Sequence, residues 1–358
     1  MCSTKIPTST RSIANKRMRI LVIGGTGFIG SHVVANLAAE HDVTVLHRGK
    51  HAPNLPPGVR LLIGNRDDLG PHAGMFREMQ PEVVLDMISG DARQAQAVAD
   101  AFRGVARRLV TTSSMDVYRS YEIALGLASG PLEPLPLTED SPVRTVMHPY
   151  KGRPPGSVPF DWVTPEYEKI LVEHVVRSKP DLPAAILRLP MVYGPGDPLH
   201  RFAALLKRMD DGREAILLEE GWAAWRSCMG YVEDVAAAIA LAVTSTAAPG
   251  RIYNVAEADA LSWADWARAV ALAAGWHGRV VTLPRDRTPK HLIPPFNTAQ
   301  HWTASSERIR RELGYRETVP RAEALARTVA WERTHPAPFD PAQFDYEAED
   351  RALALALK

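Results

Sequence analysis

The sequence predicts an α/β protein with a parallel β-sheet covered by helices on both faces and a smaller, mostly helical lobe. Short runs rich in branched apolar residues alternate with helical segments through the first half of the chain, an order typical of a parallel sheet with helical crossovers. The runs are apolar at nearly every position, as expected of strands buried on both faces. A turn with three glycines joins the first run to the first helical segment.

The individual elements follow from this alternation and from the spacing of apolar residues. Strands are predicted at residues 19–25, 43–48, 60–65, 82–88, 107–114, 184–190 and 250–257. Helices are predicted at residues 31–40, 91–102, 262–275 and 320–335. The segment 125–163 is rich in proline, so we expect no regular helix through most of it, and segments of this kind are often functional. After it, Thr164 is a suitable N-cap and Pro165 a suitable first helical residue.

These elements divide the chain into a nucleotide-binding domain, a substrate lobe and two tails. The amino-terminal tail is polar and basic and lacks the apolar centre of a secretory signal, although an organelle-targeting peptide is an alternative. The predicted divisions are a flexible tail at 1–17, a nucleotide-binding domain at 18–189 plus 228–257, a substrate lobe at 190–227 and 258–345, and a tail at 346–358.

Composition excludes several classes of protein. Lys plus Arg is 42 and Asp plus Glu is 41, a net charge of +1, so no global field attracts nucleic acid or a membrane surface. The only cysteines are Cys2 and Cys228, which excludes a disulfide framework and argues against a cysteine metal site. No apolar run approaches the roughly 18 residues of a membrane span. We expect a cytoplasmic protein with a small-molecule substrate, no metal, no nucleic acid, and the capacity to form a homodimer.

The three-glycine turn predicts a dinucleotide site. Gly24, Gly27 and Gly30 have the spacing G-x-x-G-x-x-G, after a strand and into a helix. Glycines permit a tight turn and close approach of the backbone, and the helix N-terminus presents N–H groups to a pyrophosphate. The residues expected to contact the cofactor here are Gly24, Thr26, Gly27, Phe28, Ile29 and Gly30.

With this motif the chain resembles the extended short-chain dehydrogenase/reductases, specifically the NAD-dependent epimerase/dehydratase group and its atypical relatives. Further support comes from "TTSSMDVYRS" at 111–120, "LRLPMVYGPGD" at 187–197 and "GYVEDVAAAIA" at 230–240. The resemblance extends from about residue 18 to about residue 335. It implies a Rossmann-type doubly wound sheet, an NAD or NADP cofactor, and chemistry at a hydroxyl or keto carbon.

In this group the end of the second strand selects the cofactor, and an acid there would bind the ribose hydroxyls of NAD. The strand here ends in "LHRGK" without an acid, and Arg48 is placed to pair with the 2′-phosphate of NADP. NADP is therefore favoured over NAD, the alternative being a solvated basic turn. Asp67 in "GNRDD" matches the segment that contacts the adenine, or is an ordinary surface acid.

The catalytic residues that the resemblance implies are incomplete. Ser114, four residues before the tyrosine of "SMDVY", matches the family serine, and Lys169 in "KILVE" matches the lysine that holds the ribose. The family tyrosine, four residues before the lysine, would fall on Pro165. Tyr167 is the first candidate to replace it, although on an ideal helix it lies about 200° from Lys169. Tyr150, in the proline-rich segment, is the second candidate.

The substrate side departs from the family as well. The arginine that grips a diphosphate would fall on Ser227, with Arg226 next to it, which weakens the case for a nucleotide-diphosphate sugar. Tyr193 in "VYGPG" and Arg226 are the predicted substrate-binding residues. For Trp222 and Trp225 we expect core packing rather than a pocket wall.

We therefore expect an NAD(P)-dependent enzyme that oxidises or reduces a hydroxyl or keto carbon of a sugar-like or natural-product substrate. One alternative is a redox-silent protein that binds the dinucleotide as a structural or sensory ligand. Another is an RNA-binding protein like the chloroplast stem-loop-binding relatives, which also lack the tyrosine motif. The near-zero net charge counts against RNA, since RNA affinity rests largely on phosphate contacts.

Overall fold

A computed structural model describes residues 17–49, 54–152 and 163–356. Its centre is a seven-stranded sheet with the order β10-β6-β5-β4-β1-β2-β3, in which all neighbours run parallel. The strands are β1 (Arg19–Ile23), β2 (Asp42–His47), β3 (Arg60–Ile63), β4 (Val83–Asp86), β5 (Arg108–Ser114), β6 (Ala184–Leu189) and β10 (Ile252–Asn254). The order reverses direction at β1, so this is a Rossmann-type doubly wound sheet and the predicted fold class is confirmed.

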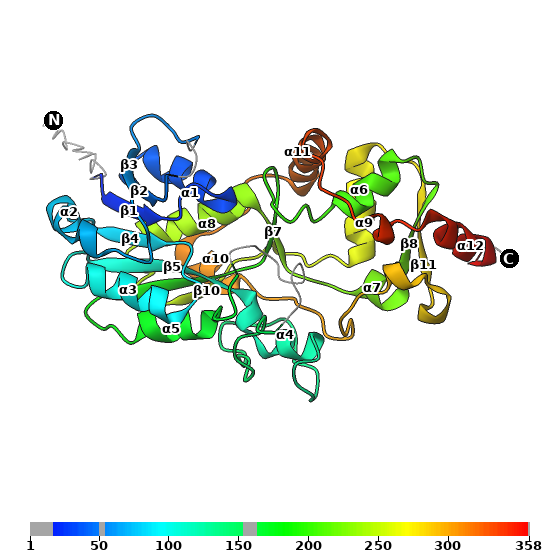
Figure 1. Ribbon diagram of the computed structural model, residues 1–358, viewed down its shortest axis with the longest axis horizontal. Coiled ribbons are helices and arrows are strands. Elements are labelled where there is room, and N and C mark those ends of the chain that lie inside the picture. The colour runs from blue at the N-terminus through cyan, green and yellow to red at the C-terminus, as the bar shows by residue number, and fades with distance from the viewer. Residues whose placement is uncertain (1–16, 50–53, 153–162, 357–358) are drawn as a thin grey trace, which may run out of the picture.

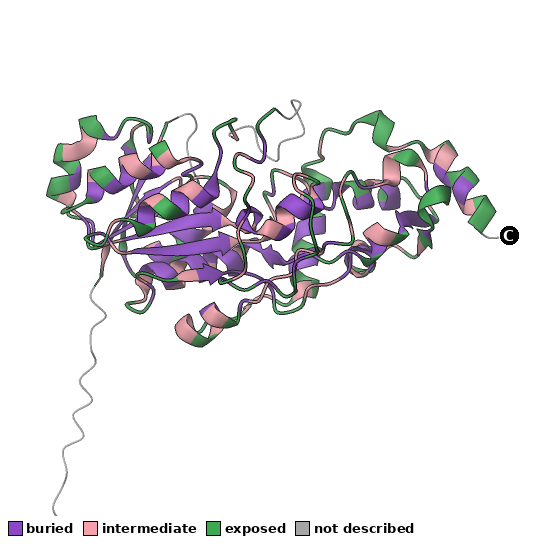
Figure 2. Ribbon diagram, turned by 90° about the horizontal axis from the view of Figure 1, so that it is seen from below, coloured by how far each residue is buried: buried purple, intermediate pink, exposed green. Residues whose placement is uncertain are grey.

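Helices cover both faces of the sheet because its strands are apolar on both sides. Ile20 and Val22 of β1 belong to the core that includes α1 (Phe28–Ala38) and α8 (Val232–Thr244). Leu21 and Ile23 belong to the opposite core, with α2 (Ala73–Met79), α3 (Ala92–Phe102) and α5 (Lys169–Arg177). Figure 2 shows the sheet as a buried layer between these helices.

A smaller lobe lies beside the sheet domain, on the right in Figure 1. Its elements are β8 (Ala215–Glu219) and the parallel β11 (Arg279–Leu283), with α6 (Ala203–Asp210), α7 (Glu220–Ala224), α9 (Trp263–Ala274), α11 (Arg321–Thr334) and α12 (Tyr346–Ala356). Between the two parts, β7 (Met191–Tyr193) pairs with β9 (Met229–Tyr231). The remaining helices are α4 (Arg119–Ala124) and α10 (Glu307–Leu313). None of the helices in the described ranges has the length and apolar character needed to cross a bilayer.

Two segments differ in secondary structure from what the sequence predicts: the carboxyl-terminal segment and the start of α5. The carboxyl-terminal residues expected as a tail form α12, which is held by a buried ion pair between Glu349 and Arg208 at 2.7 Å. The helix expected to begin at Thr164 begins at Lys169 instead. Glu168 is its N-cap, since the Glu168 carboxylate accepts the Ile170 N–H at 2.9 Å and pairs with buried Arg144 at 2.8 Å. This buried ion pair fixes the N-cap of α5 at Glu168, four residues after the expected N-cap Thr164.

Candidate active site

The glycine turn leaves an open face at the N-terminus of α1. A Cβ at Gly24, whose φ is +88°, would lie 2.6 Å from an Ile88 side-chain carbon, and one at Gly30 would lie 2.5 Å from the Gly24 carbonyl oxygen. Both positions therefore require glycine for the turn itself. Gly27 has an ordinary φ of −87°, and a Cβ there would meet nothing within 4 Å. At Gly27 the protein leaves space that a ligand can approach.

This face suits a pyrophosphate. Gly27 is the N-cap of α1, no side chain caps the helix, and its first turn contains no acid. Free N–H groups and the positive end of the helix dipole thus face the open side of the turn. Thr26 lies half-buried in the turn, and Phe28 and Ile29 line the large cavity beside it. The residues fit the dinucleotide that the motif predicts.

The two predicted adenine-side residues lie at the carboxyl ends of neighbouring strands. Arg48 is exposed and follows directly after β2, which pairs with β1, and it forms no ion pair with any described residue. Asp67 follows β3 and accepts hydrogen bonds from Gln94 at 3.0 Å and Arg93 at 3.2 Å. Arg48 is therefore placed to contact an anion beyond the end of β2.

A cavity of about 730 Å³ lies at the carboxyl ends of the strands, within the range of small-molecule sites. Its lining combines the cofactor side, through Phe28 and Ile29, with the ends of β5 and β6 and with residues from the second lobe. Four predicted catalytic residues lie together in this lining: Ser114, Tyr150, Tyr167 and Lys169.

Lys169 is the first residue of α5 and is buried. Its Nζ donates to the Ser89 carbonyl oxygen at 2.6 Å and to the Thr112 carbonyl oxygen at 3.1 Å. Burial lowers the pKa of Lys169 to about 8, although the nearby Asp86 and Asp116 carboxylates oppose this shift. The ammonium group can still donate a third hydrogen bond into the cavity.

Asp116 is a site residue that the sequence analysis missed. Its backbone N–H donates to the Ser114 hydroxyl at 3.1 Å, and its Oδ2 accepts the Tyr167 hydroxyl at 2.9 Å. The Tyr150 hydroxyl donates to the same oxygen at 3.4 Å. Burial raises the pKa of Asp116 above its usual range, against the opposing charge of Arg144. The signal was its place two residues after Ser114, which brings its carboxyl to the end of β5.

The two candidate tyrosines lie side by side. Their ring centroids are 5.3 Å apart, and the Tyr150 hydroxyl is also 2.7 Å from the Tyr121 hydroxyl. Tyr167 precedes α5 and is followed by the extended Glu168, so the angular separation of an ideal helix does not apply to it. Burial, followed by the charge of Asp116, raises the pKa of both tyrosines well above the usual value. Both hydroxyls therefore keep their protons at neutral pH.

The two predicted substrate-binding residues lie outside the cavity lining. Tyr193 is fully buried among aromatic rings, and its hydroxyl donates to Glu257 at 2.9 Å. Arg226 donates to the Ala260 carbonyl oxygen at 2.8 Å at the surface. Trp222 and Trp225 pack against each other with ring centroids 5.1 Å apart and do not line the cavity.

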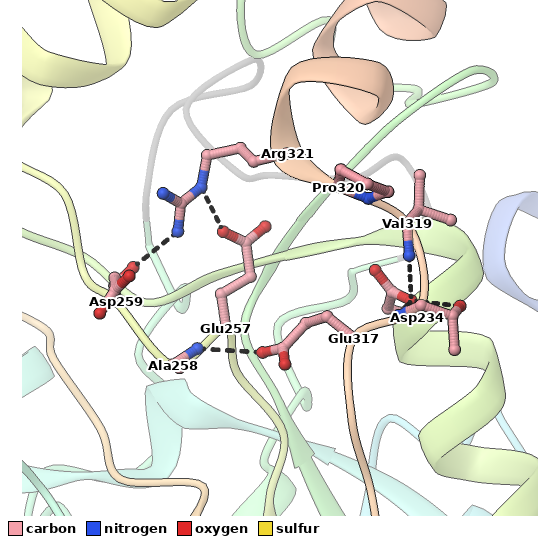
Figure 3. Close-up of a pocket in the computed structure, with 9 residues that line it drawn as sticks. Asp234, Glu257, Ala258, Asp259, Glu317, Val319, Pro320 and Arg321 are labelled. Carbon is pink, nitrogen blue, oxygen red and sulfur yellow. Dashed lines mark hydrogen bonds and ion pairs between the residues drawn. The ribbon is translucent and has the colours of Figure 1, made fainter.

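A second cavity, of about 300 Å³, lies where α8, the end of β10 and the start of α11 meet (Figure 3). It is acidic, and several of its carboxylates have partners around the cavity. Glu257 accepts from Arg321 at 2.8 Å, and Asp234 accepts the Thr318 N–H at 2.7 Å. Among the described residues, no group of three or more His, Cys, Asp or Glu side chains is arranged to hold a metal ion. This cavity lies where the sheet domain and the smaller lobe meet.

The low pKa of Lys169 predicts a pH-dependent affinity for the cofactor. Below about pH 8 the ammonium form offers a charge and a third donor, and above it the proton is lost. We expect NAD, which has no 2′-phosphate to titrate, to bind about 5- to 10-fold more weakly at pH 9 than at pH 7. Calorimetry at both values measures this, with Lys169→Met as the matched control that binds weakly at either pH. An unchanged pH dependence in Lys169→Met would assign the effect to another group.

Comparison with known proteins places this site in a family. The model of the NAD dependent epimerase/dehydratase family matches residues 20–150 and 166–256. The chain is 28% identical to 2′-dehydrokanamycin reductase of Streptomyces kanamyceticus over 77% of its length and 72% of that protein. It is 29% identical to 3-diazoavenalumate denitrifying reductase of a Streptomyces species over 85% of its own length and 97% of that protein. The fold matches DesIV, a dTDP-glucose 4,6-dehydratase from Streptomyces venezuelae solved with NAD and TYD bound, with a TM-score of 0.63 and 22% identity. The match covers 90% of this chain and 99% of DesIV. The chain therefore belongs to the NAD-dependent epimerase/dehydratase family of enzymes, which confirms the resemblance carried by its glycine turn.

Proposed function

We propose that the protein is an NADP-preferring reductase that converts a carbonyl group of a small natural-product substrate into a hydroxyl group. The observation that carries this proposal is the buried Tyr167 hydroxyl on Asp116, in one cavity with Ser114 and Lys169. The names of two relatives, 2′-dehydrokanamycin reductase and 3-diazoavenalumate denitrifying reductase, support reduction as the direction.

The protonation states favour reduction over oxidation. A nicotinamide cofactor, when bound, would supply the hydride to the carbonyl carbon. Tyr167 keeps its proton because burial and Asp116 raise its pKa, so it is prepared to donate that proton to the developing alkoxide. Ser114 would hold the same oxygen by a hydrogen bond. An oxidation would need a deprotonated tyrosine, which the burial of Tyr167 disfavours by raising its pKa.

Asp116 gives Tyr167 a way to recover its proton. Burial raises the pKa of Asp116 above its usual range, and its Oδ2 is 2.9 Å from the Tyr167 hydroxyl. As Tyr167 donates to the substrate oxygen, a protonated Asp116 would donate to Tyr167 in turn. The positive charge of Lys169 would stabilise the tyrosinate that forms between the two transfers.

NADP preference rests on Arg48 at the end of β2, where the family would place an acid for NAD. A charge-assisted bond from Arg48 to the 2′-phosphate contributes about 1.5–3 kcal/mol, or roughly 10- to 150-fold in affinity. Arg48→Ala should remove this preference and leave NAD affinity almost unchanged, because the side chain is exposed and has no ion-pair partner in the described chain. Calorimetric titration with both cofactors checks it, and equal affinities in the wild type would refute it.

The function itself is tested by hydride transfer. Purified protein with NADPH and a panel of cyclic and aromatic ketones should show loss of nicotinamide absorbance and formation of the matching alcohol. Lys169→Met serves as the matched control, since it removes the charge and the N–H donors of Lys169 while keeping a side chain of similar length. If the protein binds NADPH but reduces no member of the panel, a redox-silent dinucleotide-binding role replaces this proposal.

A further inference from the structure

The substrate side of the cavity carries an aromatic wall. Tyr121 of α4 and Trp302 line the cavity and stack on each other, with ring centroids 4.8 Å apart and planes inclined by 28°. Behind Trp302, Phe296 stacks at 5.7 Å and Trp225 packs edge-on at 5.1 Å. These contacts hold the Trp302 ring in place. Binding of a flat ligand there would therefore cost little side-chain entropy of the protein.

Apolar side chains continue this wall. The cavity lining also includes aliphatic and sulfur-containing side chains: Met115, Leu125, Leu137, Leu189, Met191, Leu199 and Cys228. A ligand in this space exchanges water for apolar contact over most of its surface. The space therefore favours a ring system with few polar groups.

The charges in the lining do not provide for a diphosphate. Among the described residues the lining cations are Lys169 and Arg201. Lys169 already donates to two backbone carbonyl oxygens on the cofactor side. Arg201 is paired with buried Asp197, its NH1 lying 2.8 and 3.0 Å from the two carboxylate oxygens. The two described cations of the lining thus already have partners, carbonyl oxygens for Lys169 and a carboxylate for Arg201. A phosphate would have to compete with these partners after losing its own water, which is unfavourable.

Three tyrosine hydroxyls lie close to Asp116. The Tyr121 hydroxyl is 2.7 Å from that of Tyr150, which donates to Asp116 beside Tyr167. A ring on the Tyr121–Trp302 wall thus lies next to the hydroxyl network that the proposed reduction uses. One carbonyl group on such a ring would lie beside these hydroxyls.

We propose that the substrate is a flat aromatic or conjugated ketone without phosphate groups, held against the Tyr121–Trp302 wall with its carbonyl at the tyrosine end. This rests on the proposed reductase function and adds the class of substrate to it. Nucleotide-diphosphate sugars occur in the names of several structural neighbours. Their diphosphate would meet the apolar lining, in which the described cations already have partners.

Binding to the NADP⁺-saturated protein tests the class with three probes: 2-acetylnaphthalene, its fully saturated 2-acetyldecalin counterpart, and UDP-glucose. We expect 2-acetylnaphthalene to bind about 3- to 10-fold more tightly than the saturated ketone, the range that one aromatic pair contributes. UDP-glucose should bind more weakly than either. Equal affinities for the two ketones, or tighter binding of UDP-glucose, would overturn the proposal without any variant.

Two variants test whether the Tyr121–Trp302 wall causes the tighter binding of the flat ketone. Trp302→Ala should weaken 2-acetylnaphthalene binding about 10-fold and leave NADP affinity unchanged. Trp222→Ala is the matched control, because Trp222 belongs to the same aromatic cluster, 5.1 Å from Trp225, but does not line the cavity. An equal loss of 2-acetylnaphthalene affinity in both variants would show that the wall does not bind the ketone. Trp302→Leu, which keeps apolar volume, replaces Trp302→Ala if that variant does not fold. Since the readout is binding, a protein that binds the flat ketone but never oxidises NADPH would contradict the reductase function alone.

Discussion

Tyr167→Phe is expected to lower turnover by about 10²- to 10⁴-fold, the usual contribution of a positioned proton donor. The change removes the hydroxyl that donates to Asp116 at 2.9 Å and keeps the ring that packs on Tyr150 at 5.3 Å. Cofactor affinity should not change, because Lys169 keeps its two carbonyl contacts. Single-turnover rates of NADPH oxidation measure the loss, and calorimetry checks cofactor binding.

Tyr150→Phe is the matched comparison, since its hydroxyl reaches the same carboxylate at the longer distance of 3.4 Å. We expect a loss of less than about 10-fold there, as for a residue that positions another. Full activity in Tyr167→Phe together with a large loss in Tyr150→Phe would move the proton donor to Tyr150. Asp116→Asn should lower the rate and flatten the basic limb of the pH profile, because the relay uses protonated Asp116 and an amide cannot carry that proton.

The sheet and the glycine turn were predictable because each depends on local patterns. Strand residues buried on both faces must be apolar throughout, as Ile20 to Ile23 are, and the predicted and observed strands agree to within a few residues. Gly24 and Gly30 are fixed by close contacts inside one turn. Such contacts lie within a few positions in the chain, so the sequence pattern contains them.

The position of Tyr167 could not be predicted, because a contact distant in the chain decides it. The Thr164-Pro165 pair is a good helix start, but the buried pair of Glu168 with Arg144 starts α5 at Lys169. Tyr167 therefore lies in extended chain, and its hydroxyl reaches Asp116. Asp116 was missed for a similar reason, since its partners Tyr150 and Tyr167 are 34 and 51 residues away.

The predicted substrate residues show the limit of transferring a family position. Tyr193 lies in a segment typical of the family, but its hydroxyl donates to Glu257 in the core. Arg226 is one position from the expected arginine, and a one-residue shift in extended chain turns a side chain to the opposite face. Its guanidinium accordingly binds the Ala260 carbonyl oxygen at the surface, while Ser227 lines the cavity.

The dinucleotide site permits a test in which loss of binding is separable from loss of fold. Gly27→Glu is expected to lower NAD and NADP affinity by more than about 100-fold. The new side chain would enter the space that the turn leaves at the α1 N-terminus and would place a negative charge against the pyrophosphate. The protein itself tolerates a side chain at this position, because φ is −87° and a Cβ meets nothing within 4 Å. A glutamate near a helix N-terminus also interacts favourably with the helix dipole.

Thermal unfolding without cofactor should therefore give a midpoint for Gly27→Glu close to that of the wild type, while calorimetry shows no binding. Gly27→Gln has the same shape without the charge and separates the two causes, so we expect it to retain more affinity than Gly27→Glu. Gly30→Ala is the opposite control, since its Cβ would lie 2.5 Å from the Gly24 carbonyl oxygen and should lower the unfolding midpoint itself. Equal binding of NAD and NADP by Gly27→Glu and the wild type would show that the pyrophosphate does not lie at this turn.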